Sequence, residues 1–600
     1  MKHNILLIIA VSVTCMASCD FLEQAPTTSL SEASAYGSEA SLEAGIIGCY
    51  GSMQGGTGWQ GEFAEYLQYA SGLVRWKSAR STENWTQTLT LSMFPRNIKN
   101  EATYTYFYFS IYKCNKLIEN LPDSPVEQAF KDEIEAEARL IRAIDYFALV
   151  RLYGDVPLIT VTAKNINEMG QPRASYMKVY EQIIRDLEYA EQHMRDEERQ
   201  TQVSGWPGRR PHKWAATSVK VAVYAQIACL IENKEYQFFD YVNKPERTPD
   251  FSALGIRDEK DAWNLALETA EDVIESKAYE LAYSYADLFR WTELSDYQLK
   301  ERIFALTSTD NVSAGMYIAV RTLPPFPEGG IQQTSNNNSG RIRPGRYVLQ
   351  KWASVHGGQL GQGRSDGCNV YVSCPDPRYD LSYFHTSYVR TNDQQETTLY
   401  PSDGSVLTVS GDPYFRKYLC PRYNIGNGYA DFYLMRYAEV ILYAAEAAAS
   451  LSSGPGDAYW QKALDYMEMI HARARRSVDG GSAHPTMADW GTLASREELV
   501  NAIMWERVFE LHGEGHDFFD THRRGAKFMS EWLTKPLNAF LKEPEQVGEL
   551  KTLFYSHYLP EDVQELRKSV LLAFPEAEFR NNPAIGFEDQ NDFYVDFLVE

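Results

Sequence analysis

The sequence is poor in cysteine. Eight cysteines occur among 600 residues, and their wide spacing excludes the small, disulfide-dense kind of secreted domain. No two cysteines form a C-x-x-C pair. Cys368 and Cys374 flank one short loop and are the only pair that suggests a disulfide, with two unbridged thiols as the equal alternative.

The chain also lacks an excess of positive charge. It carries 81 acidic against 58 basic side chains, which gives a formal net charge of −23. A field of that sign does not attract phosphate backbones, so it excludes nucleic acid as a partner and favours a neutral ligand. With 44% apolar and 13% aromatic residues, the chain has enough apolar side chains for a large globular core.

Long apolar runs are missing beyond the N-terminus. Residues 1–18 combine a basic start, an apolar run from Ile5 to Val13 and small residues before Cys19, which predicts a signal peptide. The run is too short for a permanent transmembrane helix, and no later stretch approaches ~20 uninterrupted apolar residues. The segment Met16-Ala17-Ser18-Cys19 resembles a bacterial lipobox. Lipidation of Cys19 would anchor the protein to a membrane surface, and an ordinary secretory cleavage nearby is the alternative.

Helical patterns fill most of the remaining sequence. Glu133–Leu152 has a narrow polar stripe, which predicts a mostly buried helix. Trp214–Ile231 and Phe432–Ala449 are rich in alanine, which permits close approach of neighbouring helices. Capping patterns at Ser124-Pro125-Val126-Glu127 and at Ser495-Arg496-Glu497-Glu498 predict helix starts.

The composition changes to Gly, Pro, Asn, Ser and Tyr over about 301–427, with short extended runs at Arg302–Thr307 and Met316–Val320. We expect a loop-rich insertion with short strands there, and a long insertion of this kind is usually functional. The predicted fold class is mostly α, with tetratricopeptide-like helical repeats that follow no strict 34-residue period. One domain is expected over residues 19–600, with its helical scaffold at about 38–294 and 428–525.

Catalytic and metal-binding patterns are weak. His512-Gly513-Glu514-Gly515-His516 places two histidines four residues apart, but the glycines weaken the helix that would have to hold both, and no H-E-x-x-H occurs. We therefore expect no metal and no cofactor. Carboxylates are plentiful, yet no pattern positions the pair that a glycoside hydrolase needs. The sequence favours a non-catalytic protein, with a surface glycoside hydrolase as the alternative.

Aromatic residues gather in glycine-rich, loop-like sequence. The C–H faces of sugar rings pack flat on indole and phenol rings, so such residues are typical of glycan sites. For any single tryptophan, core filling is an equal alternative. The candidate ligand-binding residues are Trp59, Tyr66, Trp76, Trp85, Trp291 and Trp352.

Several motifs, taken together and in order, resemble the SusD/RagB family. They are Cys19-Asp20-Phe21-Leu22-Glu23, Ala136–Ala143 with Tyr153-Gly154-Asp155-Val156-Pro157, Arg436-Tyr437-Ala438-Glu439-Val440, the Glu506-Arg507 to Arg523-Arg524 series, and Leu571–Pro575. Two positions depart from the family pattern. Asp517 stands where an arginine is more usual, and Asp145 stands where an aromatic residue is.

This resemblance implies a helical fold with an irregular, ligand-facing half and no catalytic residue. It implies a lipid-anchored protein at the surface of the outer membrane that binds a glycan and passes it to a SusC-like TonB-dependent transporter. A binder of peptide or another nutrient from the same family is a further alternative. Arg139 and Arg436 are expected to be paired charges on apolar helices.

Overall fold

The structure is a computed structural model that describes most of residues 35–594. Cys19, Trp85, Trp291 and Cys368 lie outside the described residues, as does the run 316–320, so the expectations for them stay predictions. The longest stretches outside the description are 1–34, 77–87, 197–209, 290–299, 308–321, 323–340, 361–371, 389–406, 419–429 and 543–557.

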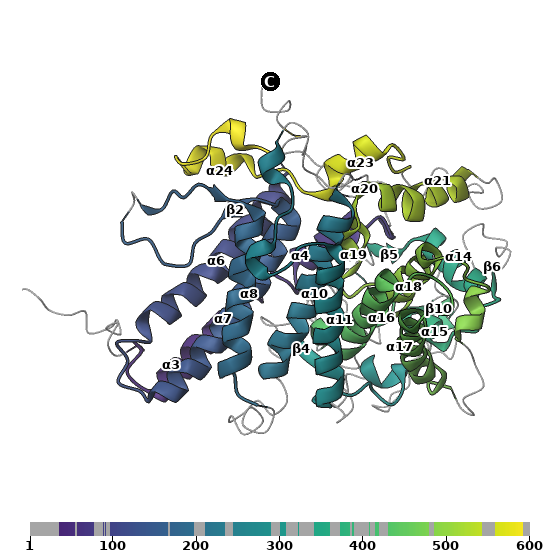
Figure 1. Cartoon of the computed structure of the whole chain (residues 1–600), viewed down its shortest axis with the longest axis horizontal. Helices are drawn as coiled ribbons and strands as arrows, with labels where there is room; N and C mark the ends of the chain where they lie inside the picture. Colours follow the sequence, from purple (N-terminus) through teal and green to yellow (C-terminus); the bar gives the residue numbers. More distant parts are fainter. Residues whose placement is uncertain are drawn as a thin grey trace, which may run out of the picture.

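Long helices form most of the first half of the chain and lie side by side across the molecule (Figure 1). Helices α7 and α8 run antiparallel, because Asp132 near the start of α7 contacts Tyr189 near the end of α8, while Phe147 contacts Tyr180. The helices of this half are α3 (Glu39–Ser52), α4 (Glu62–Ala70), α6 (Ile98–Asn120), α7 (Gln128–Tyr153), α8 (Tyr176–His193), α10 (Lys213–Glu232) and α11 (Glu259–Ser276).

The second half continues this helical array, since α16 packs on both α11 and α10. Its helices are α14 (Arg346–Val355), α15 (Pro377–Ser382), α16 (Tyr437–Leu451), α17 (Ala458–Arg475), α18 (Arg496–Leu511), α19 (Asp517–Arg523), α20 (Gly525–Phe528), α21 (Lys535–Lys542), α23 (Val563–Val570) and α24 (Glu576–Asn581). The expected fold class, mostly α with few and short strands, is confirmed.

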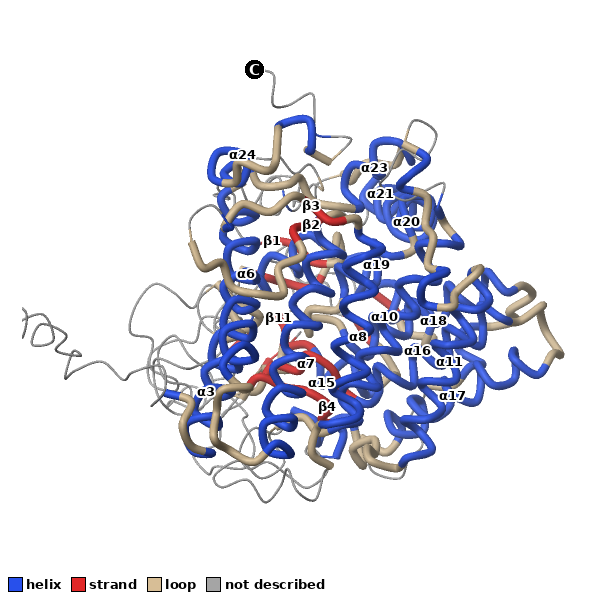
Figure 2. Tube along the Cα trace, turned by 60° about the vertical axis from the view of Figure 1, so that its left-hand side comes forward, coloured by secondary structure: helices blue, strands red, loops and turns tan. Residues whose placement is uncertain are grey.

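The strands are short and lie within a molecule dominated by helices (Figure 2). Each strand of the described part pairs with one antiparallel partner, and several pairs join segments far apart in sequence. The pairs are β1 (Val74–Trp76) with β5 (Ile342–Pro344), β4 (Arg302–Leu306) with β12 (Phe432–Arg436), β2 (Val156–Pro157) with β3 (Arg173–Ala174), β6 (Gln359–Leu360) with β7 (Val372–Ser373), β8 (Tyr383–Phe384) with β11 (Tyr414–Phe415), and β9 (Ser387–Tyr388) with β10 (Leu407–Thr408).

Two predicted helix starts differ from the structure, and a third is confirmed. Helix α7 begins at Gln128 rather than beside Ser124. The Ser124 hydroxyl donates to the Tyr36 carbonyl and accepts from the Val126 N–H, which lies before the first residue of the helix. Phe432–Arg436 is a strand, since it pairs with β4 before α16 begins. The Ser495 hydroxyl accepts a hydrogen bond from the Glu498 amide and caps α18 as predicted.

Helix α10 is long and apolar enough to cross a membrane by length and composition, the only such helix among the described residues. It lies inside the molecule, with 78% of its most apolar window buried. Its alanines are buried, and the helix packs closely on α8 and α11. We therefore read α10 as a core helix.

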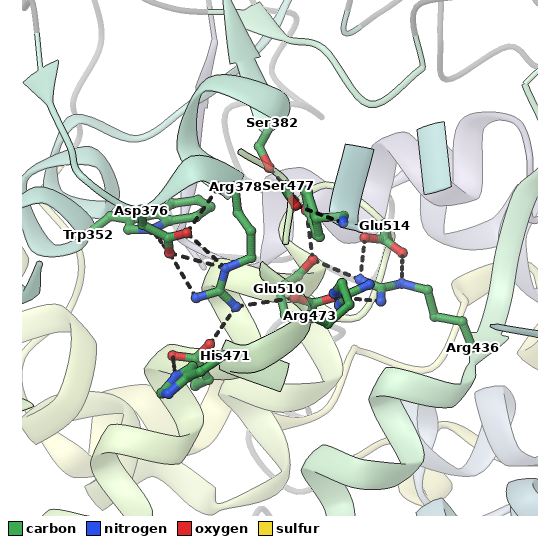
Figure 3. A network of polar contacts seen from close by, with 12 residues as sticks. Trp352, Asp376, Arg378, Ser382, Arg436, His471, Arg473, Ser477, Glu510 and Glu514 are labelled. Atoms are coloured by element: carbon green, nitrogen blue, oxygen red, sulfur yellow. Dashed lines mark hydrogen bonds and ion pairs between the residues drawn. The ribbon is translucent and has the colours of Figure 1, made fainter. Parts of the chain in front are cut away.

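A network of buried ion pairs lies between the second-half helices and the insertion (Figure 3). Arg436, at the end of β12, donates to Glu514 at 2.8 Å, to Glu510 at 2.6 Å and to Glu301 at 2.8 Å. Arg473 of α17 also donates to Glu510 and Glu301. A guanidinium group with several carboxylate partners is the arrangement that makes burial of such charges tolerable.

The insertion joins this network through α15. Arg378 donates to Asp376 at 2.8 Å and reaches Glu506 and Glu510 of α18. Burial alone would raise the pKa of Glu510, but the surrounding guanidinium groups hold that pKa well below its usual range. The expectation of a paired Arg436 is confirmed. Arg139 is likewise paired, with Glu135 and with Asp186 at 2.9 Å, although it is partly exposed.

The buried carboxyl of Asp145 is of a different kind. It lies in α7, fully buried, where its carboxyl accepts a long 3.4 Å bond from the Trp59 indole and a hydrogen bond from the Ser110 side chain, with no guanidinium partner of the kind that Glu510 has among the described residues. Burial raises the pKa of Asp145 to about 7. Burial likewise raises the pKa of Asp517 to about 7. Asp145 and Asp517, the two departures from the family pattern, are therefore interior carboxyl groups whose burial is only partly offset by stabilising neighbours.

We expect Arg436→Met to lower the melting temperature strongly. The substitution leaves Glu301, Glu510 and Glu514 without a main partner, and breaking a buried charge pair of this kind costs about 3–5 kcal/mol. Thermal unfolding followed by circular dichroism measures the change. Arg257→Ala is the control, because Arg257 pairs only with Asp261 on the surface. Equal melting of both variants would contradict the structural role of the network.

We expect Asp145→Asn to stabilise the protein at pH 8 but not at pH 4. Because the folded pKa lies above the unfolded value, the wild type loses stability as the pH rises from about 4 to about 7, and asparagine does not. The difference at pH 8 should reach roughly 4 kcal/mol at most, from ~1.4 kcal/mol per pKa unit. Melting temperatures of both proteins across this range test the sign, and a pH-independent difference would contradict it.

Candidate functional site

A groove lies between α3 and β4. Its cavity volume is about 220 Å³, larger than two cavities of about 60 and 30 Å³ elsewhere in the described part. Buried residues of β4 form one wall, while the exposed Ile47 and Gly51 lie on the opposite, helical wall. The lining residues are Ile47, Tyr50, Gly51, Gln54, Arg210, Phe304, Ala305, Leu306 and Thr307.

The helical wall follows from the sequence of α3. Ile47 and Gly51 are four residues apart, which places them on one face of α3, and Gln54 follows just beyond the end of the helix. The opposite face carries Leu42 and Ile46, which are buried in the core. Helix α3 is therefore fixed by its apolar face, and its groove face stays available for a ligand.

Tyr50 is held at the groove by charged neighbours. Its hydroxyl donates to Glu137 at 2.6 Å, and its ring meets the Phe304 ring edge to face at 5.9 Å. Burial, together with the Glu137 charge, raises the pKa of Tyr50 well above its usual value. Arg210 donates to both Glu137 and Glu43, so these carboxylates are neutralised by a guanidinium group.

Amide side chains cover the outer edge of β4. Gln54 donates to the Thr307 carbonyl at 3.1 Å, and Gln60 donates to the Leu306 carbonyl at 2.6 Å. Strand β12 occupies the other edge of β4. The groove therefore presents side chains rather than a free strand edge to a ligand.

This arrangement suits binding of a neutral, hydroxyl-rich ligand. Tyr50, Phe304 and Leu306 supply apolar surface for the face of a ring. Gln54, Thr307 and Arg210 supply amide, hydroxyl and guanidinium groups for hydroxyls at its edge. No carboxylate lines the groove among the described residues, so a pair of acids for glycoside hydrolysis is not found there.

Trp59 and Tyr66, two of the candidate ligand-binding residues predicted from the sequence, do not offer exposed rings. Trp59 is 6% exposed and packs edge-on against Phe63 and Phe107, with centroids 4.9 and 5.6 Å away. Tyr66 of α4 is fully buried in the core. Both rings have protein neighbours that a sugar would have to displace.

Trp352 is also a core residue. It is fully buried in α14, stacks on Phe509 at 4.9 Å, and donates its indole N–H to Asp376 at 2.7 Å. The spacing of Val348, Leu349 and Trp352 is helical, so the buried face of α14 was readable in the sequence. The expectation that Trp352 contacts ligand is corrected by this packing.

The remaining candidates are only partly placed. Trp76 ends β1, where it lies opposite Ile342 of β5. Trp85 and Trp291 lie outside the described residues. None of the candidates that the structure describes is among the groove-lining residues. The groove residues Tyr50, Gln54 and Arg210 come from segments that sequence reasoning did not connect.

The histidines near residue 512 have protein contacts. His512 lies 2.6 Å from the Tyr383 hydroxyl, and His516 lies 3.2 Å from Glu439. Burial lowers the pKa of His512 well below its usual value. No group of three or more metal-ligating side chains occurs among the described residues.

Comparison with sequence families matches both halves of the chain. Residues 20–225 match a model described as starch-binding and associating with the outer membrane, and residues 300–594 match the model of the SusD family. SusD-like protein P2 of Formosa agariphila is 25% identical over 526 residues, which are 85% of this chain and 88% of that protein. A SusD-like protein of Bacteroides ovatus is 26% identical over 294 residues, 48% of this chain and 47% of that protein.

Solved structures share the fold. A SusD homologue from Bacteroides thetaiotaomicron superposes with a TM-score of 0.65 at 18% identity, covering 92% of this chain and 96% of that chain. A protein crystallised with xylogluco-oligosaccharide gives a TM-score of 0.62 at 19% identity, covering 90% and 97%. A laminarin-binding SusD-like protein gives 0.60 at 19% identity, covering 93% and 100%. The chain therefore belongs to the SusD/RagB family.

Proposed function

We propose that this protein binds a glycan in the groove between α3 and β4 without cleaving it. The observation that carries the proposal is the composition of the groove, which joins the apolar surface of Tyr50 and Phe304 to the polar groups of Gln54, Thr307 and Arg210. A sugar ring needs both kinds of surface at once. The family model described as starch-binding, and relatives whose names mention xylogluco-oligosaccharide and laminarin, support this ligand class.

The proposed role is capture at the cell surface followed by delivery to a TonB-dependent transporter of the SusC type. A lipid on Cys19 would hold the protein at the outer membrane, in keeping with the description of the family model. Trp76, Trp85 and Trp291 are proposed to extend the binding surface by stacking. Trp59, Tyr66 and Trp352 are left out of this proposal because their rings are buried.

We expect Gly51→Phe to weaken glycan binding by tenfold or more, which is about 1.4 kcal/mol. Gly51 is exposed and lines the groove, and a Cβ atom there meets nothing within 4 Å, so the new ring would fill the groove without disturbing the helix. Isothermal titration with a panel of soluble glycans, including xyloglucan oligosaccharides and laminarin, measures the affinity.

Gly48→Phe is the matched control for this experiment. Gly48 lies on the same helix, is exposed and has equal space for a side chain, but it does not line the groove. Its affinity should equal that of the wild type. If Gly51→Phe also keeps wild-type affinity, the ligand binds elsewhere. Release of shorter sugars by the wild-type protein would show an enzyme instead of a binder.

We expect alanine in place of Trp76, Trp85 or Trp291 to weaken binding by about tenfold each, with little change in melting temperature. Stacking on an aromatic face is worth about 1–3 kcal/mol, by analogy with nucleobases. Trp352→Ala should instead lower the melting temperature, because its ring fills the core. Unchanged affinity in all three of these variants would contradict the stacking proposal and leave the groove as the one proposed binding site.

We expect Cys19→Ser to prevent lipidation and to release the protein from membranes. Metabolic labelling with a fatty acid, followed by membrane fractionation, measures both effects. Cys15→Ser is the control and should still be labelled, because only Cys19 directly follows the small residues of the lipobox. Labelled, sedimenting Cys19→Ser protein would show that the anchor was assigned to the wrong residue.

A further inference from the structure

A second cavity lies where the two halves of the chain meet. Its volume is about 60 Å³, and α7 and α10 of the first half face β12, α16 and α19 of the second half across it. Phe304 lines both this cavity and the groove, so its side chain separates the two. Most of the lining is apolar or aromatic, including Trp59, Phe147, Phe432 and Phe519.

Arg151 is one of the few charged side chains on this lining. Its guanidinium carbon lies 3.7 Å from the centre of the Phe147 ring and 3.5 Å from that of the Phe519 ring. Its Nε donates to the Phe147 carbonyl at 3.0 Å, and no carboxylate of the described residues forms an ion pair with it. Burial lowers the pKa of Arg151 to about 10. Arg151 is partly exposed, and the N–H groups that it does not donate to Phe147 remain available for water.

Glu439 and His516 line the same cavity from the second half. Glu439 is buried, and its Oε1 lies 3.2 Å from His516 Nδ1. Neither Glu439 Oε2 nor His516 Nε2 has a hydrogen-bond partner among the described residues. Burial disfavours the charged imidazole, but the Glu439 carboxylate outweighs that effect and raises the pKa of His516. The cavity is therefore lined by one hydrogen-bond acceptor, Glu439 Oε2, and by two hydrogen-bond donors, His516 Nε2 and the Arg151 guanidinium group.

We propose that this cavity is a hydration site, in which a cluster of bound water molecules links Arg151 to Glu439 and His516. The occupant must accept from Arg151 and His516 and also donate to Glu439 Oε2. A halide ion has no hydrogen to donate to Glu439, and the Arg151 guanidinium group repels a metal ion. A volume of about 60 Å³ exceeds the roughly 10–15 Å³ that a single water molecule needs, so the cavity holds more than one.

The water cluster joins the two halves of the fold. Arg151 belongs to the first half, whereas Glu439 and His516 belong to the second, and no direct hydrogen bond among the described residues joins Arg151 to either. Water-mediated bonds are nearly as favourable as direct ones and tolerate small shifts in distance. The two halves are therefore coupled at this point by a water-mediated polar contact that tolerates small changes in the distance between them.

A crystal structure of the wild-type protein, at a resolution that shows ordered water, tests the proposal. We expect water density within hydrogen-bond distance of Glu439 Oε2 and of the Arg151 terminal nitrogens. An empty cavity would overturn the proposal, as would an anomalous bromide peak beside Arg151 after soaking in sodium bromide. The wild-type structure decides the matter, so the result does not depend on the folding of a variant.

Filling the cavity gives a second, independent measurement. Ala222 lines the cavity from α10, and Ala222→Val adds two methyl groups to it. In a dry cavity the added surface would raise the melting temperature. In a hydrated one it displaces water and leaves Glu439 Oε2 and His516 Nε2 without a partner, so we expect the melting temperature to fall. A rise in melting temperature would contradict the hydration site.

Discussion

The buried ion network around Arg436 and Glu510 is the constraint on which the second half of the fold depends. Desolvating one guanidinium group or carboxylate costs several kcal/mol, and that cost is offset only when its partners are all in position. Arg378 comes from the insertion, Arg473 from α17 and Glu510 from α18. Each of these segments must therefore be in place for the others to be stable, which gives the loop-rich insertion a fixed attachment to the helices.

The same network reaches the proposed binding groove through β4. Glu301, the residue before this strand, accepts hydrogen bonds from Arg436 and Arg473, and Arg302 at its start pairs with Asp431. Two residues later, Phe304 lines the β4 wall of the groove. Because the strand is anchored at its first residues and paired with β12 along its length, its groove face is preorganised for a ligand.

Sequence patterns predicted the helical part of the fold well because helices carry local signals. The polar stripe of α7, the alanines of α10 and the Ser495 cap of α18 each lie within a few turns of chain. Strand β12 was mistaken for the start of a helix, since its pairing with β4 joins residues far apart in sequence. Motif resemblance supplied the family. The need of a charge on an apolar helix for a partner predicted the paired state of Arg436, and the structure supplies three carboxylate partners.

The groove was not predictable from local patterns, because its walls come from α3, β4 and Arg210. Aromatic content alone could not separate ligand contacts from core filling, and the buried rings of Trp59 and Trp352 show why. Each of these indoles has a carboxylate acceptor inside the protein, Asp145 and Asp376. Which tryptophans have such an internal partner depends on tertiary contacts that the sequence pattern does not contain.

A crystal structure of the protein with a bound glycan tests the central claim most directly. Our account predicts a sugar ring against Tyr50 and Phe304, with hydroxyls within hydrogen-bond distance of Gln54 and Arg210 and with β4 unmoved. A glycan bound on another face, with the groove between α3 and β4 empty, would contradict it.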